Sequence, residues 1–280
     1  MAGRSASTWD HYRQCGPETL GDGRVVVGAL KLLADGALGS RGAALHDAYC
    51  DDPGNTGLLL VPAEEVERLT LEAGALGFQV CVHAIGDRAN RETLNIFEQA
   101  FKANPAKRDL RWRVEHAQHL SLQDIPRFGQ LGVIASMQGI HCTSDAPYVA
   151  ERLGAKRAEE GAYVWQKLMK SGAVVSNGTD APVEDVDPIA NYYATVSRKT
   201  KDGRVFYPDQ RMSRMEALKS YTLNGAYAAF EESSRGSLKV GKLADMTVLS
   251  KDITTIAEDD IPTVQIIYTI VGGKILYKKP

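Results

Sequence analysis

The feature that most limits the fold is a regular alternation of short apolar runs with longer amphipathic stretches between residues 25 and 235. The short runs fit buried strands, and the stretches between them have the spacing of helices. This alternation predicts βα units, and therefore an α/β fold with a parallel sheet. Strands are expected at five places along the chain: residues 24–35, 78–83, 111–116, 132–137 and 173–180.

The two ends of the chain have a different texture. Residues 1–24 are polar and poorly patterned, so we expect an irregular lead segment. Residues 236–280 contain period-two runs and the turn signal Gly272-Gly273, which is typical of antiparallel strands. The expected organisation is a lead segment at 1–24, a (β/α) portion at 25–235 and a small β appendage at 236–280.

Composition excludes several classes of protein. The 33 basic and 35 acidic residues nearly cancel, and the sequence has no long basic block of the kind that binds a nucleic-acid backbone. The 4 cysteines include no C-x-x-C pair, which argues against a zinc knuckle or a disulfide scaffold. No run approaches the ~20 apolar residues of a membrane span, and the start lacks the apolar core of a signal peptide. We expect a cytoplasmic protein without a nucleic-acid or membrane partner.

Polar side chains recur where the predicted strands end. In (β/α) barrels these ends converge on one face, where the active site forms. Histidine and carboxylate ligands gathered there suit a divalent ion such as zinc. The residues concerned are Lys31 with Asp35, His83, His116, Gln138 with His141, and Asp180.

Each of these residues also has a structural explanation. A single histidine at a strand end is more often a satisfied core residue than a ligand, and an Asp before Ala-Pro, as at Asp180, is a common turn former. A buried Lys31 can extend its ammonium group to the mouth of the barrel or pair with Asp35. The joint spacing of the polar ends is therefore the informative signal.

Several motifs together resemble one known family. They are "KLLADGALGSRGAAL", "VCVHAIGDRAN", "RVEHAQ", "SNGTDAPVEDVDP" and "GSLKVGKLADMTVL". The chain resembles the metal-dependent amidohydrolase superfamily, in the amidohydrolase family 3 branch that includes N-substituted formamide deformylase-like enzymes. The resemblance runs from about Val25 to the C-terminus and implies a partial TIM-type (β/α) barrel with a small C-terminal β appendage.

The resemblance also implies a site. Its metal ligands would be Lys31, His83, His116 and Asp180, holding one or two ions, most simply zinc. Lys31 would react with carbon dioxide to form a bridging carbamate, and its burial favours the uncharged amine that this reaction needs. Asp180 would also be the catalytic proton carrier. Arg41, Gln138 and His141 are the candidate substrate-binding residues, although Arg41 is equally suited to bracing a loop.

The implied activity is hydrolysis of a non-peptide carbon-nitrogen bond, of amide or formamide type, in a small molecule by metal-activated water. The chain departs from the family because none of its 6 histidines are spaced as His-x-His. It therefore resembles the C-terminal half of such an enzyme, which predicts either self-association into a homo-oligomer or a complementary N-terminal segment.

Two other functions compete with hydrolysis. A truncated, non-catalytic remnant or assembly module is the main alternative, and the missing His-x-His favours it. A phosphate-binding loop at "DGALGSRG" is the other. Its glycines match neither G-x-G-x-x-G nor the Walker pattern.

Overall fold

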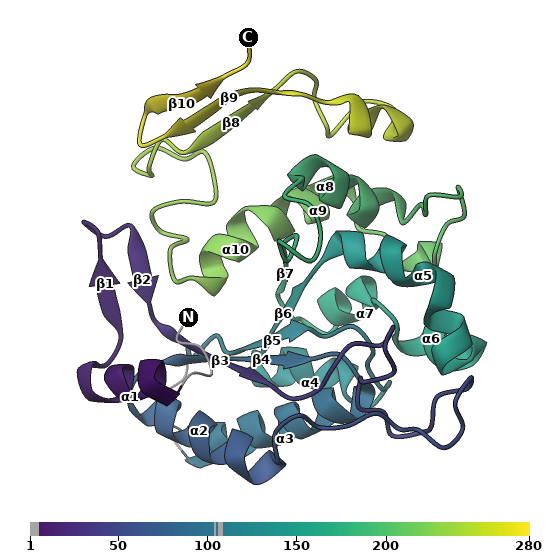
Figure 1. Ribbon diagram of the computed structural model, residues 1–280. Helices are drawn as coiled ribbons and strands as arrows, with labels where there is room; N and C mark the ends of the chain where they lie inside the picture. The colour runs from purple at the N-terminus through teal and green to yellow at the C-terminus, as the bar shows by residue number, and fades with distance from the viewer. Residues whose placement is uncertain (1–5, 104, 106–108) are drawn as a thin grey trace. The chain divides into compact units, whose positions relative to one another are not determined.

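The main sheet contains five parallel strands in the order in which they occur along the chain (Figure 1). The computed structural model describes residues 6–103, 105 and 109–280. Each strand of this sheet pairs with the strand that precedes it, which confirms the predicted α/β class and the partial TIM-type barrel. The strands are β3 (Ala29–Leu33), β4 (Gln79–Ala84), β5 (Arg113–His116), β6 (Ile134–Met137) and β7 (Val175–Asn177).

The chain divides into two compact units. The first contains the residues up to Ser136 together with Tyr148–Val174, and the second contains Met137–Pro147 together with Val175–Pro280. Within the first unit, α2 (Ala63–Ala75) and α3 (Asp87–Ala103) lie along one side of the sheet (Figure 1). The same chain segments also contain α4 (Ile125–Leu131), α6 (Ala155–Gly161) and α7 (Trp165–Lys170).

The core of the first unit forms between the sheet and these helices. Leu30, Val80 and Val114 are almost completely buried in three adjacent strands. Trp112, just before β5, packs edge-on against Phe97 of α3 at 5.0 Å between ring centroids. Nearly continuous burial of β4 explains why its sequence reads as an apolar run, whereas β5 alternates half-buried Arg113 and Glu115 with buried Val114 and His116.

The second unit contains β7, three helices and a small antiparallel sheet in the order β10-β9-β8. In the outer strand of that sheet, Ile275 and Leu276 are 59% and 68% exposed. The small sheet confirms the β appendage predicted for the C-terminus. The elements are α8 (Pro188–Ser197), α9 (Arg214–Tyr221), α10 (Leu223–Ala228), β8 (Met246–Leu249), β9 (Ile266–Val271), β10 (Lys274–Lys278) and the short 3-10 helices η1 (Pro208–Gln210) and η2 (Glu258–Thr263).

Near the N-terminus the structure differs from expectation in two ways. Part of the expected irregular lead forms α1 (Ala6–Cys15), because Trp9 buries its ring against Phe78 at 5.4 Å between centroids. The strand predicted at 24–35 is two strands, since β2 (Val25–Val27) pairs antiparallel with β1 (Glu18–Leu20) and β3 begins after Gly28.

A further difference is α5 (Gly139–Leu153), which was not expected because it contains Pro147. Proline inside a helix removes one backbone hydrogen bond, so the sequence does not look helical there. The helix carries His141 and crosses from the second unit into the first. Among the helices that the structure describes, none is long and apolar enough to cross a membrane.

Candidate metal centre

Two of the predicted ligands, His83 and His116, lie side by side at the ends of adjacent strands. His83 is the penultimate residue of β4 and His116 is the last residue of β5. Their ring centroids are 4.5 Å apart and the rings meet edge to face at 70°. Two imidazoles at this separation can act on the same small ligand or ion.

His83 is prepared to act as a neutral ligand. Burial lowers its pKa to about 3, and the nearby charges of His116 and Lys31 act in the same direction, against a hydrogen bond to the backbone of Gly36. Its Nε2 atom is buried and makes no hydrogen bond to any residue that the structure describes. The Gly36 bond therefore involves Nδ1 and leaves the Nε2 lone pair for an ion, which is the usual arrangement of a metal-bound histidine. The residues present thus fit a divalent metal.

His116 has an unusual backbone. Its φ is +78° and that of the next residue, Ala117, is +44°, in the left-handed region that residues with side chains seldom occupy. Such conformations persist only where the surroundings enforce them, and they concentrate at functional sites. The turn redirects the chain just where the strand delivers the imidazole.

Lys31 belongs to the same region of the first unit. The register places Lys31 beside Cys81 and Cys81 beside Arg113, so the three side chains share one face of the sheet. His83, two residues after Cys81 in β4, is on that face as well. The charge of Lys31 contributes, after burial and the charge of His116, to lowering the pKa of His83.

A half-buried ion pair shares this region with Lys31. Arg113 Nε donates to Glu115 Oε1 at 3.0 Å. Burial raises the pKa of Glu115, but the charge of Arg113, hydrogen bonds from Ser136 and Arg113, and the charge of Lys31 outweigh it, so the pKa is lowered overall. The face that carries Lys31 is therefore polar and internally paired.

The second unit brings together another pair of predicted residues. One ligand atom of His141, in α5, lies within 4.8 Å of one of Asp180, three residues after β7. His141 is buried, whereas Asp180 is exposed and has a φ of +59°. Ser144 Oγ donates to Glu184 Oε1 at 2.6 Å and thereby ties α5 to the loop after Asp180. Gln138, immediately before α5, is buried in the same unit.

Arg41 is engaged in an ion pair. Its Nη2 and Nε atoms donate to the two carboxylate oxygens of Asp51 at 2.8 and 3.2 Å, and Arg152 pairs with the same carboxylate. The hydrogen bond with Asp51 raises the pKa of Arg41 and lowers that of Asp51. This geometry braces the loop after β3, and substrate binding by Arg41 stays a prediction.

Asp35 follows the first predicted strand, where the sequence suggests it as a partner of Lys31 but not as one of the four metal ligands. It is completely buried, and its Oδ1 lies 3.6 Å from His83 Nε2. Burial raises its pKa to about 7, against three backbone hydrogen bonds and the charge of Arg88, which lower it. Its position directly after the apolar run of β3 was visible in the sequence, but its hydrogen-bond partners were not.

The structure thus groups the predicted residues by unit. Lys31, His83 and His116 share one region of the first unit, and Gln138, His141 and Asp180 belong to the second. Within the first unit, the imidazole nitrogens of His83 and His116 are donors of the kind that suits a divalent ion.

Comparison with known proteins gives several curated relatives. The chain is 39% identical over 252 residues to the protein LONG AFTER FAR-RED 3 of Arabidopsis thaliana, covering 90% of this chain and 43% of that protein. It is 36% identical over 265 residues to the putative amidohydrolase YtcJ of Bacillus subtilis, with 94% and 49% covered. It is 27% identical over 253 residues to the N-substituted formamide deformylase of Arthrobacter pascens, with 90% and 46% covered. The chain spans about half the length of the curated relatives it matches.

Solved structures and a family model agree with these relatives. An uncharacterised metal-dependent hydrolase from Pyrococcus horikoshii superposes with a TM-score of 0.80 at 32% identity, covering 90% of this chain and 50% of that one. The model of the amidohydrolase family matches residues 4–277, almost the whole chain. The chain therefore belongs to the amidohydrolase family.

Proposed function

We propose that this chain carries the metal-binding and proton-transfer residues for hydrolysis of a non-peptide carbon-nitrogen bond of amide or formamide type. The observation that carries the proposal is the His83–His116 pair, with its buried Nε2 atom, in a chain of the amidohydrolase family. The names of two relatives, a putative amidohydrolase and an N-substituted formamide deformylase, support the bond type.

The proposed ligands are Lys31, His83, His116 and Asp180, and zinc is the proposed ion. Low pKa at His83 supports its role, because a histidine that stays neutral needs no deprotonation before it binds metal. Conversion of Lys31 to a carbamate belongs to the same proposal. It would replace an ammonium cation, which repels a metal ion, with an anionic oxygen donor.

The chemistry divides between the ion and the chain's own residues. When bound, a divalent ion lowers the pKa of a water molecule towards ~7 and polarises the substrate carbonyl. Asp180 accepts the proton that the water loses on attack and delivers it to the departing amine nitrogen. The exposed position of Asp180 next to His141 gives its carboxylate access to a substrate from solvent. Gln138, His141 and Arg41 remain the proposed contacts to polar groups of the substrate.

A remnant or assembly module is the second candidate function. None of the chain's 6 histidines are spaced as His-x-His, the motif with which the family's pattern completes its metal site. Under the first candidate, a complementary N-terminal segment or a second copy of the chain supplies the missing ligands. Partners and substrates of the complete enzyme are therefore part of the proposal.

Activity measurements with a matched variant test this proposal. The chain is assayed with zinc and bicarbonate on N-formyl and N-acyl amines, alone and extended by an N-terminal segment carrying His-x-His. Asp180→Asn should abolish hydrolysis, whereas Asp185→Asn, at an exposed aspartate in the same loop, should leave it unchanged. A chain that binds no zinc and shows no Asp180-dependent hydrolysis in either form is a remnant.

A further inference from the structure

Asp35 forms an unusual set of hydrogen bonds for a buried aspartate. Its Oδ1 accepts from the backbone N–H of Ile85 at 2.9 Å, and its Oδ2 accepts from Gly86 and Ala44, each at 2.8 Å. Both oxygens are thus acceptors, and the three bonds favour the ionised carboxylate because they lower its pKa against the effect of burial. Among the described residues it forms no ion pair with an arginine or lysine.

These bonds join two segments that are far apart in the sequence. Ala44 belongs to the long loop after β3, whereas Ile85 and Gly86 connect β4 to α3. The contact is close: a Cβ atom added to Gly86 would lie 2.0 Å from the Ala44 carbonyl oxygen. That carbonyl accepts in turn from Arg88 N at 3.1 Å. The carboxylate therefore fixes the turn that directly follows His83.

Asp35 could join these two segments without lying near a proposed metal ligand. Here Asp35 Oδ1 lies 3.6 Å from His83 Nε2, the buried ring atom without a hydrogen bond to any described residue. An ion at that nitrogen would sit close to a carboxylate whose solvation by water has been replaced with three backbone dipoles. Outer partners of this kind orient a metal ligand and increase the affinity of the site for the metal.

We propose that Asp35 is a positioning residue of the metal centre, which fixes the His83 ring through Ile85 and Gly86 and places a fixed negative charge beside the ion. The inference rests on the proposed metal centre. It adds a residue that is not one of the four proposed ligands. In this proposal Asp35 acts beside the ion and is not one of its ligands.

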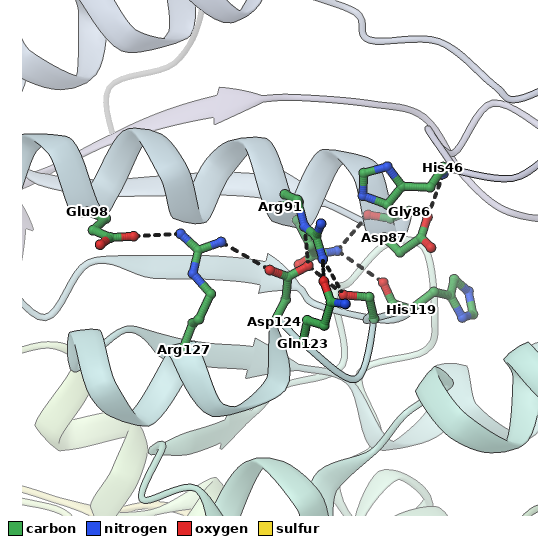
Figure 2. A network of polar contacts seen from close by, with 11 residues as sticks. His46, Gly86, Asp87, Arg91, Glu98, His119, Gln123, Asp124 and Arg127 are labelled. Atoms are coloured by element: carbon green, nitrogen blue, oxygen red, sulfur yellow. Dashed lines mark hydrogen bonds and ion pairs between the residues drawn. The ribbon is translucent and has the colours of Figure 1, made fainter.

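A control must separate positioning of the metal from simple stabilisation of the fold. Asp124 provides it, because it is also a buried aspartate of the first unit that joins separate segments. Arg91 Nε and Arg127 Nη1 donate to its carboxylate at 2.9 and 3.0 Å, and Arg127 also reaches Glu98 (Figure 2). Asp124 lies in the loop before α4, so its loss should affect stability alone.

The test is zinc binding to the metal-free wild type, Asp35→Asn and Asp124→Asn by isothermal titration calorimetry, on samples whose folded state is checked by circular dichroism. We expect the dissociation constant of Asp35→Asn to rise about 10- to 100-fold, as for other outer partners of metal ligands. The constant of Asp124→Asn should stay within about twofold of wild type. With cobalt(II) in place of zinc, the visible absorption bands should shift only in Asp35→Asn.

Three outcomes would overturn the inference. If folded Asp35→Asn binds zinc as tightly as wild type, Asp35 is only a clamp and the metal centre itself stands. If wild type binds no zinc, the proposed function fails and this inference with it. Should Asp35→Asn not fold, NMR of wild type labelled with ¹⁵N-histidine decides: zinc must coordinate His83 through Nε2 with Nδ1 protonated, and any other result rejects the inference.

Discussion

Asp35 and Asp124 are two buried aspartates of one unit whose carboxylates are stabilised in different ways. Asp124 is surrounded by guanidinium groups and the hydroxyl of Ser121, which donates at 2.6 Å (Figure 2). Asp35 is held by backbone N–H groups and faces an imidazole. Asp124 forms direct ion pairs with two arginines, whereas Asp35 forms none with a described arginine or lysine and is influenced only through the charge of Arg88.

This difference in bonding helps to distinguish a carboxylate that stabilises the fold from one that supports a metal site. Removing a carboxylate from water costs several kcal/mol unless an opposite charge compensates. At Asp35 this cost appears as a pKa raised to about 7 by burial. A cation bound next to such a buried carboxylate would lower this energetic cost. Titratable groups with perturbed pKa values concentrate at functional sites.

The largest expected effect is on zinc binding and concerns His116, a proposed ligand in the region of Asp35. His116→Ala should weaken zinc binding by more than about 100-fold, since it removes a proposed ligand and loss of an outer partner alone costs 10- to 100-fold. Elemental analysis and calorimetric titration measure the loss. His46→Ala, which removes an exposed imidazole of the loop after β3, is the matched control and should retain the metal. Equal zinc in both variants would place the ion elsewhere.

A smaller effect is expected at Asp124, on the structural side. Asp124→Asn should lower the free energy of unfolding by about 2 kcal/mol, below the 3–5 kcal/mol of a fully buried pair because the Arg91 side chain is 30% exposed. Urea denaturation at neutral pH measures the change. A variant as stable as wild type but impaired in zinc binding would reverse the assignment of the two aspartates.

The smallest effect concerns His119, on the segment that joins His116 to Asp124. Burial lowers the pKa of His119 to about 3 from 6.5, so the folded state resists protonation and stability falls as the pH drops below 6.5. At pH 5.5 the wild type should have lost about 1.4 kcal/mol on this account. His119→Phe should lack this loss. Urea denaturation at pH 7.5 and 5.5 measures it, and identical pH dependence of the two proteins would contradict the prediction.

Sequence alone predicts the main sheet well because its strands are buried on both sides. Runs such as Val80–Val82 admit few polar residues, so Lys31, His83 and His116 stand out against them. Their grouping follows from the parallel order of β3, β4 and β5. The family model matches residues 4–277, which include these three strands.

What the sequence does not reveal depends on contacts between distant segments. Asp35 looks like an ordinary loop residue until Ala44 and Ile85 are seen to donate to it, 9 and 50 positions away. The Arg41–Asp51 pair could not be told from a substrate contact by residue type alone, since guanidinium groups bind carboxylates of either origin. Helix α5 was not predicted because it contains Pro147. The sequence pattern treats a proline as the end of a helix, but this helix tolerates the loss of one backbone hydrogen bond.

The order of the main sheet has a consequence for synthesis of the protein. Because β3, β4, β5, β6 and β7 pair in the order in which they are made, each strand meets an already completed neighbour as it leaves the ribosome. No strand must wait for a later one to be inserted between two earlier ones, and loop-closure entropy is incurred one βα segment at a time. The longest wait is for β4, since the loop that Asp35 later anchors must be made first.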